Sequence, residues 1–508
     1  MTVGAATLQP DVARRDIPQR DRTQRDGPSG LGGRWAGAAL LALTAFALIP
    51  VAVAVPLPLL GAALVAFGLV ALACAHPPAA AYILLTATPL IAGLERSAYI
   101  PLLRPHEALA VVLAAGVGLR ALIQLSRGGL PLRLRRVDVV LILMALASSL
   151  LPLVWMAARS ITPTVEDLFY AATMWKFYGI FVLVRASVRT ERQVARCLYL
   201  SISAGMVVAV IAILQSLKVP VVLGLVSLIY ETADPNAAGA GRGSSTLGSP
   251  IAVGDVMAYS LVICLALLRV HRARWFLIPA AGLFCLGALG SGQFSGVIAL
   301  VVSVAVAVIV TGQVRRLLLV LGPAMLVAAA ALQPILQGRL NDIDSTGVPQ
   351  SWYIRWVNLH DFIWPELMTG WNWLFGVRPT PVIRIDAVWG PYIYIESGHT
   401  WLLWIGGVPF LLAYLLFTWV AIRTVIPVFR LRRDAVGAAA IASLASLVTA
   451  FVLMSFDPHI TMRGTADLMF SLLALATAVP ALARSPHRPN AVISERNSGE
   501  RHIRCTPT

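Results

Sequence analysis

The residue types that can do chemistry gather between Pro334 and Gly398. This is the only long segment between two hydrophobic runs that is rich in both charged and aromatic side chains. They are Arg339, Asp342, Asp344, Trp352, Arg355, Trp356, His360, Asp361, Trp364, Glu366, Arg378, Arg384, Asp386, Trp389, Glu396 and, just beyond the segment, His399. Guanidinium groups form paired hydrogen bonds with phosphate oxygens, and histidine can accept a proton near neutral pH. The segment therefore indicates a site for a phosphate-bearing ligand and a hydroxyl group.

Two arginines elsewhere in the chain could join Arg355. Arg242 lies in the segment Gly-Arg-Gly-Ser-Ser-Thr-Leu-Gly-Ser-Pro, whose glycines allow the backbone to approach a ligand closely. Arg104 precedes a hydrophobic run in Leu-Leu-Arg-Pro-His-Glu, and by itself it is typical of an anchor at a membrane interface. Because Arg keeps its charge, several arginines around one cavity would suit a diphosphate.

His399 opens the hydrophobic run that follows this segment, and Glu396 stands three residues before it. The histidine is either a structural residue at a helix start or a group that accepts a proton from a hydroxyl. Lys176 lies near the centre of another hydrophobic run, where an ammonium group costs about 2.5–3.5 kcal/mol on insertion scales. We predict Asp255 as its partner, in a pair that holds two helices together. The alternative is that Lys176 contacts an anionic lipid headgroup.

The composition identifies the elements that must position these residues. Of the 508 residues, 58% are hydrophobic and 13% are charged, so the chain is too apolar to keep its surface in water. A membrane-crossing helix needs roughly 20 apolar residues. We predict an all-α polytopic membrane protein with about 12–14 transmembrane helices and one long structured extracytoplasmic loop. The predicted spans are 35–55, 57–75, 79–94, 107–125, 137–158, 168–186, 194–217, 250–270, 275–290, 294–312, 317–333, 399–421, 435–456 and 468–484.

Charge sets the predicted orientation. The parts in order are a disordered cytoplasmic tail at 1–34, transmembrane helices within 35–333, the extracytoplasmic loop 334–398, transmembrane helices within 399–484, and a disordered cytoplasmic tail at 485–508. With this orientation the cytoplasmic segments hold 28 of the 40 Lys and Arg residues and the outer loops hold 10, as the positive-inside rule requires. The outer loops are 95–106, 159–167, 218–249, 334–398 and 457–467. We expect a multi-pass protein of the cytoplasmic (inner) membrane with both termini in the cytoplasm.

The long outer loop carries an apolar stripe at helical spacing. Its members are Trp352, Trp356, Leu359, Ile363 and Leu367. The spacing predicts an amphipathic helix that Pro365 ends or kinks. This helix either lies on the outer membrane surface, with its indoles at the headgroup level, or packs on the spans beneath it.

Several function classes are disfavoured. The net charge of +16 comes from short loops and tails, whereas a nucleic-acid partner would need a basic face on a soluble domain. The sequence has no HExxH, Walker A or GxSxG motif and no CxxC pair among its five cysteines. The predicted outer histidines show no metal-ligand spacing; they are His106, His360, His399 and His459. We therefore expect neither a metal nor a cofactor.

These motifs resemble the O-antigen ligase and polysaccharide polymerase superfamily of bacterial multi-span membrane glycosyltransferases. The resemblance runs over about residues 80 to 480 and is strongest from Arg242 to Pro409. The matching pieces are Arg242 with Thr-Leu-Gly-Ser-Pro opening a span, Ser-Gly-Gln between two short spans, Arg355-Trp356 in the long loop, the Pro365 to Gly376 segment, and the Glu-Ser-Gly-His helix with its Gly-Gly. The chain departs from the family pattern at Gln293, where Arg is common, and at Ile251 and Thr400, where Asn is often seen.

The resemblance implies transfer of a sugar chain from a polyprenyl diphosphate to an acceptor hydroxyl outside the cytoplasmic membrane, without a nucleotide sugar or a metal. It implies that Arg242 and Arg355 bind the diphosphate and that His399 orients or deprotonates the acceptor. The supporting substrate-binding candidates are Lys176, Arg104, Glu396 and Arg378. The implied partners are a lipid-linked glycan donor, a glycan or lipid acceptor, and membrane lipids. Because a diphosphate leaves readily, positioning and charge stabilisation would suffice for such a reaction.

The alternative function is a lipid-linked glycan flippase or a solute transporter that does no chemistry. Transporters place ionisable residues near the membrane midplane on interrupted helices and commonly show internal repeats. Here most of the charge that is not cytoplasmic gathers in the outer loops, and no repeat is evident. The pattern favours the enzyme.

Overall fold

The computed structural model of the protein describes residues 57–95, 103–128, 134–231, 242–270, 273–312, 350–387 and 390–479, and the single residues Gly322, Ala330, Gln333 and Gln337. The chain divides into two units, Met1–Val65 and Ala66–Thr508, and the description below concerns the second. Within the described residues, eight helices are long and apolar enough to cross a membrane. The prediction of an all-α polytopic membrane protein is confirmed.

The helices follow the predicted spans closely. In chain order the elements are α2 (Leu57–Ala75), α3 (Pro77–Ile91), α4 (Pro105–Ser126), α5 (Arg136–Ala158), α6 (Val165–Ser187), α7 (Glu191–Ser216), α8 (Pro220–Ile229), η1 (Ser245–Leu247), α9 (Pro250–Leu267), α10 (Arg274–Gly290), α11 (Phe294–Thr311), α14 (Gln350–Asn358), η2 (Leu359–Ile363), α15 (Trp364–Met368), α16 (Asn372–Phe375), β1 (Val382–Ala387), β2 (Gly390–Tyr394), α17 (Gly398–Leu431), α18 (Ala435–Leu453), η3 (His459–Thr461) and α19 (Thr465–Ala478). The predicted span 35–55, nearly all of 317–333, and both predicted tails lie outside the described residues.

Local sequence signals explain where many of these helices begin. Proline occupies the first helical positions of α3, α4, α8 and α9, where its missing N–H costs no hydrogen bond. Thr164 and Thr190 close capping boxes at the starts of α6 and α7. Helix α8 lies in what the sequence predicts as a loop, because its ten residues, most of them apolar, are too few for a span.

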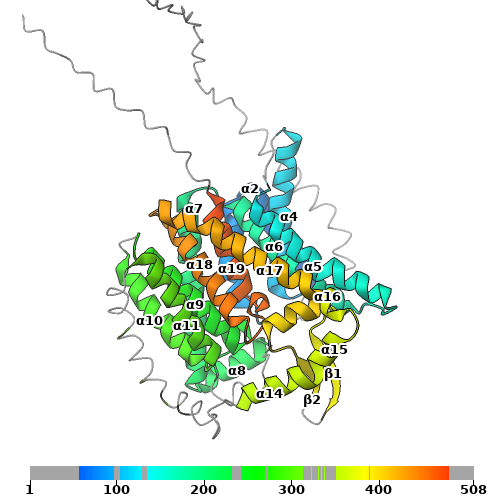
Figure 1. The fold of residues 1–508 in the computed structure, drawn as a ribbon. Helices are drawn as coiled ribbons and strands as arrows, with labels where there is room; N and C mark the ends of the chain where they lie inside the picture. The colour runs from blue at the N-terminus through cyan, green and yellow to red at the C-terminus, as the bar shows by residue number, and fades with distance from the viewer. Residues whose placement is uncertain are drawn as a thin grey trace, which may run out of the picture. The chain divides into compact units, whose positions relative to one another are not determined.

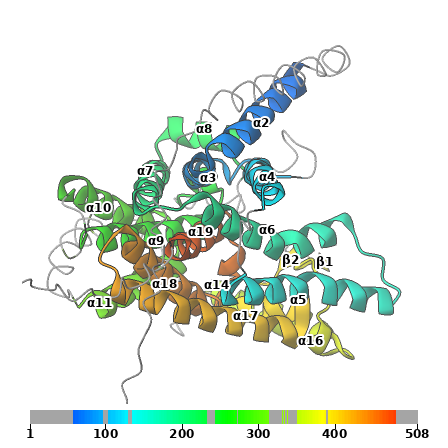
Figure 2. The ribbon, with the colours of Figure 1, turned by 90° about the horizontal axis from the view of Figure 1, so that it is seen from above.

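Three helices form the centre of the bundle. Almost every residue of α9 and most residues of α18 are buried, and α19 packs against both. Figure 2 shows α9, α18 and α19 between α10 and α11 on one side and α5 and α6 on the other. Helices α5 and α17 run side by side in both views (Figures 1 and 2). The central helices are therefore covered by the surrounding helices over most of their surface.

One end of the bundle gathers the described parts of the five loops that the sequence predicts to lie outside. Leu94 and Tyr230 form a β-bridge between the first and third of them. Ion pairs join Arg378 to Asp167 at the start of α6, and Arg355 to the loop that follows α18. We call this end, where residues 93–95, 103–104, 159–167, 217–231, 242–249, 350–387, 390–397 and 454–464 meet, the loop end; Figure 1 shows α8, α14, α15, β1 and β2 there.

The opposite end carries charges that the sequence predicts to be cytoplasmic. The Arg185 guanidinium donates two hydrogen bonds to the Asp138 carboxylate, at 2.7 and 2.6 Å, and both side chains are buried. Arg432 and Asp434 pair at 2.6 Å, and Asp434 also caps α18. Hydrogen bonds from Arg432 hold the pKa of Asp434 below its usual value, although burial alone would raise it. The two ends are thus fixed by separate sets of ion pairs.

The long loop folds as a helical arm followed by a hairpin. Residues 350–368 form α14, a π-helical turn and α15, and strands β1 and β2 pair antiparallel. The π-helical turn comes directly before Pro365, which lacks the N–H that a regular helix would use there. Ile363 and Leu367 are buried, whereas Trp352 and Trp356 are exposed. The apolar stripe therefore packs on the spans at one end and leaves its indoles uncovered at the other.

Helix α17 is interrupted where this loop packs against it. Gly406 and Gly407 have non-helical backbone angles, and Gly407 has φ +63. The break exposes the Trp404 carbonyl, which accepts a hydrogen bond of 2.6 Å from the Val377 backbone N–H. A Cβ on Gly407 would collide with the Leu374 backbone in α16. The glycine pair thus admits the loop backbone into the side of α17.

We predict that Gly407→Ala lowers the thermal midpoint of the protein in detergent, corresponding to a loss of roughly 1–3 kcal/mol, because alanine disfavours positive φ and its Cβ meets backbone. Gly179→Ala in α6 is the matched control, since its Cβ would meet nothing within 4 Å. The control should leave the midpoint unchanged or raise it slightly, because alanine is the better helix former. Equal midpoints for the two variants would contradict this account of the break.

Candidate functional site

Arg355 is the residue that fastens the helical arm to the bundle. Its Nε lies 3.3 Å from Glu396 Oε2, and its Nη1 lies 3.2 Å from Asp457 Oδ2. The arginine side chain is about one-fifth exposed, whereas that of Asp457 is almost fully buried. Burial raises the pKa of Glu396 above its usual value, although the Arg355 charge lowers it in part. The Arg355 guanidinium is therefore shared between two carboxylates. Of these, Glu396 gains a proton more easily than an exposed glutamate does.

Asp457 connects this group to a buried pair inside the bundle. The His459 backbone N–H donates to the Asp457 carbonyl at 2.7 Å, and the His459 Nδ1 lies 2.6 Å from Asp255 Oδ2. Neither side chain of the His459–Asp255 pair is exposed. Burial by itself would lower the pKa of His459, but the Asp255 carboxylate outweighs it and raises that pKa above 6.5. Asp255 therefore partners a histidine, in a pair held by electrostatic attraction.

His399 sits at the start of α17, beside the end of α18. Its backbone N–H donates to the Met454 carbonyl at 3.2 Å, and its ring contacts Phe451 edge to face at 6.3 Å. The preceding Gly398 is needed for this approach, because a Cβ there would lie 2.7 Å from the Met454 carbonyl oxygen. The imidazole is half-buried. It thus stands three residues from Glu396 in sequence and beside the segment that leads to Asp457.

A second ion-pair group at the loop end centres on Glu231. Its Oε2 lies 3.0 Å from Arg104 Nη1 and 3.2 Å from Arg463 Nη1. Arg104 also opens α4, where its backbone N–H donates to Glu107 at 3.1 Å. Arg463 belongs to the same short loop as Asp457. That loop, residues 454–464, therefore joins the Glu231 group to the Arg355 group.

The predicted partner of Lys176 is wrong. Its Nζ lies 3.5 Å from Glu107 Oε1 in α4 and 4.5 Å from the centre of the Phe177 ring, while Asp255 pairs with His459. Glu107 and Asp255 both lie at a depth that suits Lys176. The partner is decided by which side of each helix faces the lysine. The lysine thus joins α6 to α4 near the loop end.

Arg378 is bound to the start of α6. Its Nε and Nη2 donate to the two Asp167 carboxylate oxygens at 3.1 and 2.7 Å. The Thr380 hydroxyl adds a third bond to Asp167, at 2.7 Å. The hydrogen bonds that Arg378 donates to the Asp167 carboxylate raise the pKa of Arg378 above its usual value. Its role as a substrate contact remains a prediction, and the geometry adds a structural role.

Arg242 lies just before η1, at the loop-end termini of α7 and α10. The following Gly243 donates its backbone N–H to the Gly290 carbonyl at 3.0 Å. A Cβ on Gly243 would lie 2.5 Å from the Ala212 carbonyl oxygen, so the glycine permits this close approach. The segment that carries Arg242 is therefore held against α7 and α10. Arg355 is instead held by Glu396, just before α17, and by Asp457, in the loop after α18.

The site brings together some predicted residues and adds others. Arg355, Glu396 and His399 share one region, and Arg104 lies in the neighbouring ion-pair group. Sequence reasoning missed Asp457, Arg463 and Glu231 as partners. One signal could have found them: each is a charged residue in or beside a predicted outer loop, where the arginines needed counter-charges. No protein-family model and no curated protein matches the chain.

The His459–Asp255 pair predicts a pH-dependent stability. Because the folded-state pKa of His459 is raised, its stabilising effect is fully present below about pH 6.5 and is lost as the pH rises through the folded-state pKa. The thermal midpoint in detergent of the natural protein should exceed that of His459→Gln by more at about pH 6 than at about pH 9. His360→Gln, which changes an exposed histidine, serves as the control and should show no such pH dependence. A constant difference for His459→Gln across this range would contradict the charged pair.

Proposed function

We propose that the protein is a membrane glycosyltransferase that polymerises or ligates polyprenyl-diphosphate-linked glycan at the outer face of the cytoplasmic membrane. The observation that supports this most directly is the Arg355–Glu396 ion pair. It ties the helical arm to the stretch that opens α17 with His399. A phosphate-binding cation and a proton-accepting ring thus share one region at the loop end.

The ion pair can give way to a phosphate ligand. In the structure the Arg355 charge is shared between two carboxylates. Because burial raises the pKa of Glu396, this carboxyl takes up a proton more readily than an exposed glutamate does. A neutral Glu396 no longer competes with a diphosphate for the guanidinium. The resulting charge-assisted bonds are stronger than neutral ones and would stabilise the leaving diphosphate.

In the proposed reaction the bond between the sugar C1 and the diphosphate oxygen breaks. A new bond forms between C1 and the acceptor oxygen, and the acceptor proton passes to the His399 imidazole. The diphosphate leaves on its lipid with the electron pair of the broken bond and is met by Arg355, with Arg242 as the second predicted contact. Arg104, Lys176 and Arg378 remain predicted contacts at the edge of this site. No metal or cofactor is needed for these steps.

The helical arm offers a way to meet a lipid-linked substrate. Trp352 and Trp356 are exposed on α14, although both are large and largely apolar. Indole rings favour the headgroup level of a membrane, where the ring is half in lipid and the N–H is in water. An arm seated there would bring Arg355 to the depth of a lipid diphosphate. This supports an outer-surface position for the arm.

A flippase or transporter is the alternative, and the interrupted helix α17 is the observation that favours it. Broken helices commonly build transport sites. In α17, however, the freed carbonyl of Trp404 is satisfied by Val377 from the loop, and the Trp404 Nε1–H donates to the Thr380 carbonyl at 3.0 Å. Packing of the loop thus explains the break without a transported ligand.

We predict that Arg355→Ala reduces glycan transfer by about 10²–10³-fold, because removing one donor that stabilises developing charge has this order of effect. Transfer would be measured with the purified protein in liposomes that contain an undecaprenyl-diphosphate-linked oligosaccharide and an acceptor glycan. Arg423→Ala, an exposed arginine later in α17, is the control and should keep full activity. Full transfer by Arg355→Ala would remove this arginine from the proposed site.

We predict that His399→Ala loses transfer to a similar degree, since the acceptor hydroxyl loses its proton acceptor. His360→Ala is the control, because His360 is an exposed histidine at the same end of the bundle, on the helical arm. Movement of the same lipid-linked oligosaccharide across the liposome membrane should be equal in both variants. If the natural protein, Arg355→Ala and His399→Ala all move the lipid but transfer no glycan, the result would support the transport alternative instead.

A further inference from the structure

Two arginines of the loop end, apart from the Arg355 group, meet on one oxygen atom. Arg104 Nη1 and Arg463 Nη1 donate to the same carboxylate oxygen, Glu231 Oε2, at 3.0 and 3.2 Å. The three side chains come from three different loops, before α4, after α8 and before α19. The two guanidinium groups therefore converge on the position that the Glu231 oxygen occupies.

The segment that carries Glu231 is fixed by contacts other than those with the arginines. Tyr230 forms a β-bridge with Leu94, and the Glu231 backbone N–H donates to the Gly93 carbonyl at 2.8 Å. The Tyr230 hydroxyl donates to the Leu90 carbonyl at 3.1 Å. The ion pair is therefore not needed to hold this segment beside α3.

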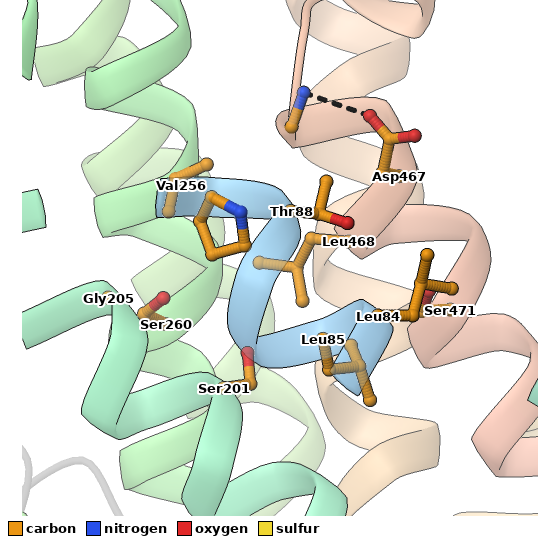
Figure 3. Close-up of a pocket in the computed structure, with 12 residues that line it drawn as sticks. Leu84, Leu85, Thr88, Ser201, Gly205, Val256, Ser260, Asp467, Leu468 and Ser471 are labelled. Carbon is orange, nitrogen blue, oxygen red and sulfur yellow. Dashed lines mark hydrogen bonds between the residues drawn. The ribbon is translucent and has the colours of Figure 1, made fainter. Parts of the chain in front are cut away.

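The two arginines are likewise placed through their own backbones. Arg104 is the residue before α4, and its backbone N–H donates to the Glu107 carboxylate at 3.1 Å. Arg463 precedes Gly464, which has φ +71 and donates its backbone N–H to Asp467 at 2.9 Å. Figure 3 shows this hydrogen bond at the start of α19. The backbone on both sides of the meeting point is thus set independently of the Glu231 side chain.

The charges around this point do not cancel. Arg104 and Arg463 bring two positive charges, and Glu231 brings one negative charge. Glu107 does not offset the difference, because it pairs with Lys176 at 3.5 Å. The Glu231 side chain is 39% exposed, whereas that of Arg104 is 10% exposed, and exposed ion pairs add little to stability. The carboxylate is therefore the member of this group that an anion of higher charge can replace.

We propose that Arg104 and Arg463 form an anion site in which a phosphate group takes the place of the Glu231 carboxylate. The hydrogen bonds to Glu231 use one nitrogen of each arginine and meet on one oxygen. A phosphate group has several oxygens and can accept paired hydrogen bonds from two guanidinium groups at once. Phosphate therefore fits the two arginines better than the carboxylate that they hold in this structure.

The position suits the phosphate of a membrane lipid. Arg104 directly precedes α4, one of the helices that are long and apolar enough to cross a membrane. Only 28% of the apolar 18-residue stretch of α4 is buried inside the protein, and Figure 2 shows the helix at the edge of the bundle. A lipid headgroup can thus reach the arginines from the side. A free diphosphate offers the same chemistry, and the experiment separates the two sources.

The test measures binding, so it can be made whether or not the proposed glycan transfer occurs. The full-length protein in detergent would be dialysed to equilibrium against ³²P-labelled inorganic diphosphate. Undecaprenyl diphosphate in mixed micelles would serve as the competitor, and undecaprenol as its uncharged counterpart. Each measurement would be repeated with Arg355→Ala, which removes the proposed transfer-site cation. We expect saturable diphosphate binding that persists in Arg355→Ala.

Two substitutions should change the diphosphate affinity in opposite directions. Arg463→Ala should weaken it by roughly tenfold or more, because a charge-assisted contact is lost. If Arg463→Ala does not fold, Arg463→Lys should weaken binding severalfold, since lysine keeps the charge but not the paired donors. Glu231→Gln should instead tighten binding severalfold, because the competing carboxylate charge is gone. Glu366→Gln, which changes an exposed glutamate of α15, is the matched control and should leave the affinity unchanged.

The outcomes separate the ligand sources and decide the proposal. Tighter binding of undecaprenyl diphosphate than of inorganic diphosphate, with none of undecaprenol, would identify a lipid headgroup as the ligand. Equal affinities would identify the free diphosphate group as sufficient. The proposal would be overturned if the natural protein bound neither diphosphate saturably. Unchanged or weaker binding by Glu231→Gln would also overturn it, because the carboxylate would then not be the group that phosphate replaces.

Discussion

The contact of Arg355 with two carboxylates from different parts of the chain is the constraint on which the loop end depends. Glu396 comes from the stretch before α17, and Asp457 from the loop after α18. The Asp457 side chain is buried, so without Arg355 its charge would lie in surroundings that stabilise it poorly. The two ion pairs together fix the helical arm against the start of α17 and the loop after α18. The position of His399 follows, because it is fixed to the end of α18 by its backbone and lies three residues beyond Glu396.

Hydropathy and charge alone predict most of the helices, because a spanning helix is a local property of about twenty residues. The described helices agree with twelve of the predicted spans, and the five loops predicted to lie on one side meet at one end. The exceptions have physical causes. Helix α8 is too short to register as a span. The hairpin of β1 and β2 was missed, although residues 383–387 alternate between apolar and polar, because strands of six and five residues give only a short signal within a long loop.

The candidate site was predictable only in part, because sequence shows residue types but not their partners. Arg355, Glu396 and His399 lie within one segment, so their proximity follows from the short chain between them. The partners Asp457 and Glu231 come from distant loops, and no local signal connects them to an arginine. For Lys176, the sequence indicates how deep the residue lies in its helix but not which neighbouring helix it faces. The predicted partner Asp255 was therefore wrong. The Gly406–Gly407 break shows the same limit: the glycines are visible in sequence, whereas the Val377 backbone that requires them is not.

The loop end and the interior of the bundle are connected by shared helices. Helix α9 carries Asp255, which holds His459, and Ser260, which lines a small cavity together with Asp467 of α19. Helix α19 begins directly after the loop 454–464, and its Thr465 hydroxyl donates to the Ala252 carbonyl of α9 at 3.1 Å. Protein interiors are packed too densely to deform smoothly, so a change in the spacing of α9 and α19 moves side chains at both regions. The packing of α9 against α19 thereby holds the loop that supplies Asp457 to Arg355. The geometry of the loop end therefore depends on the packing of α9 and α19 inside the bundle as well as on the ion pairs of the helical arm.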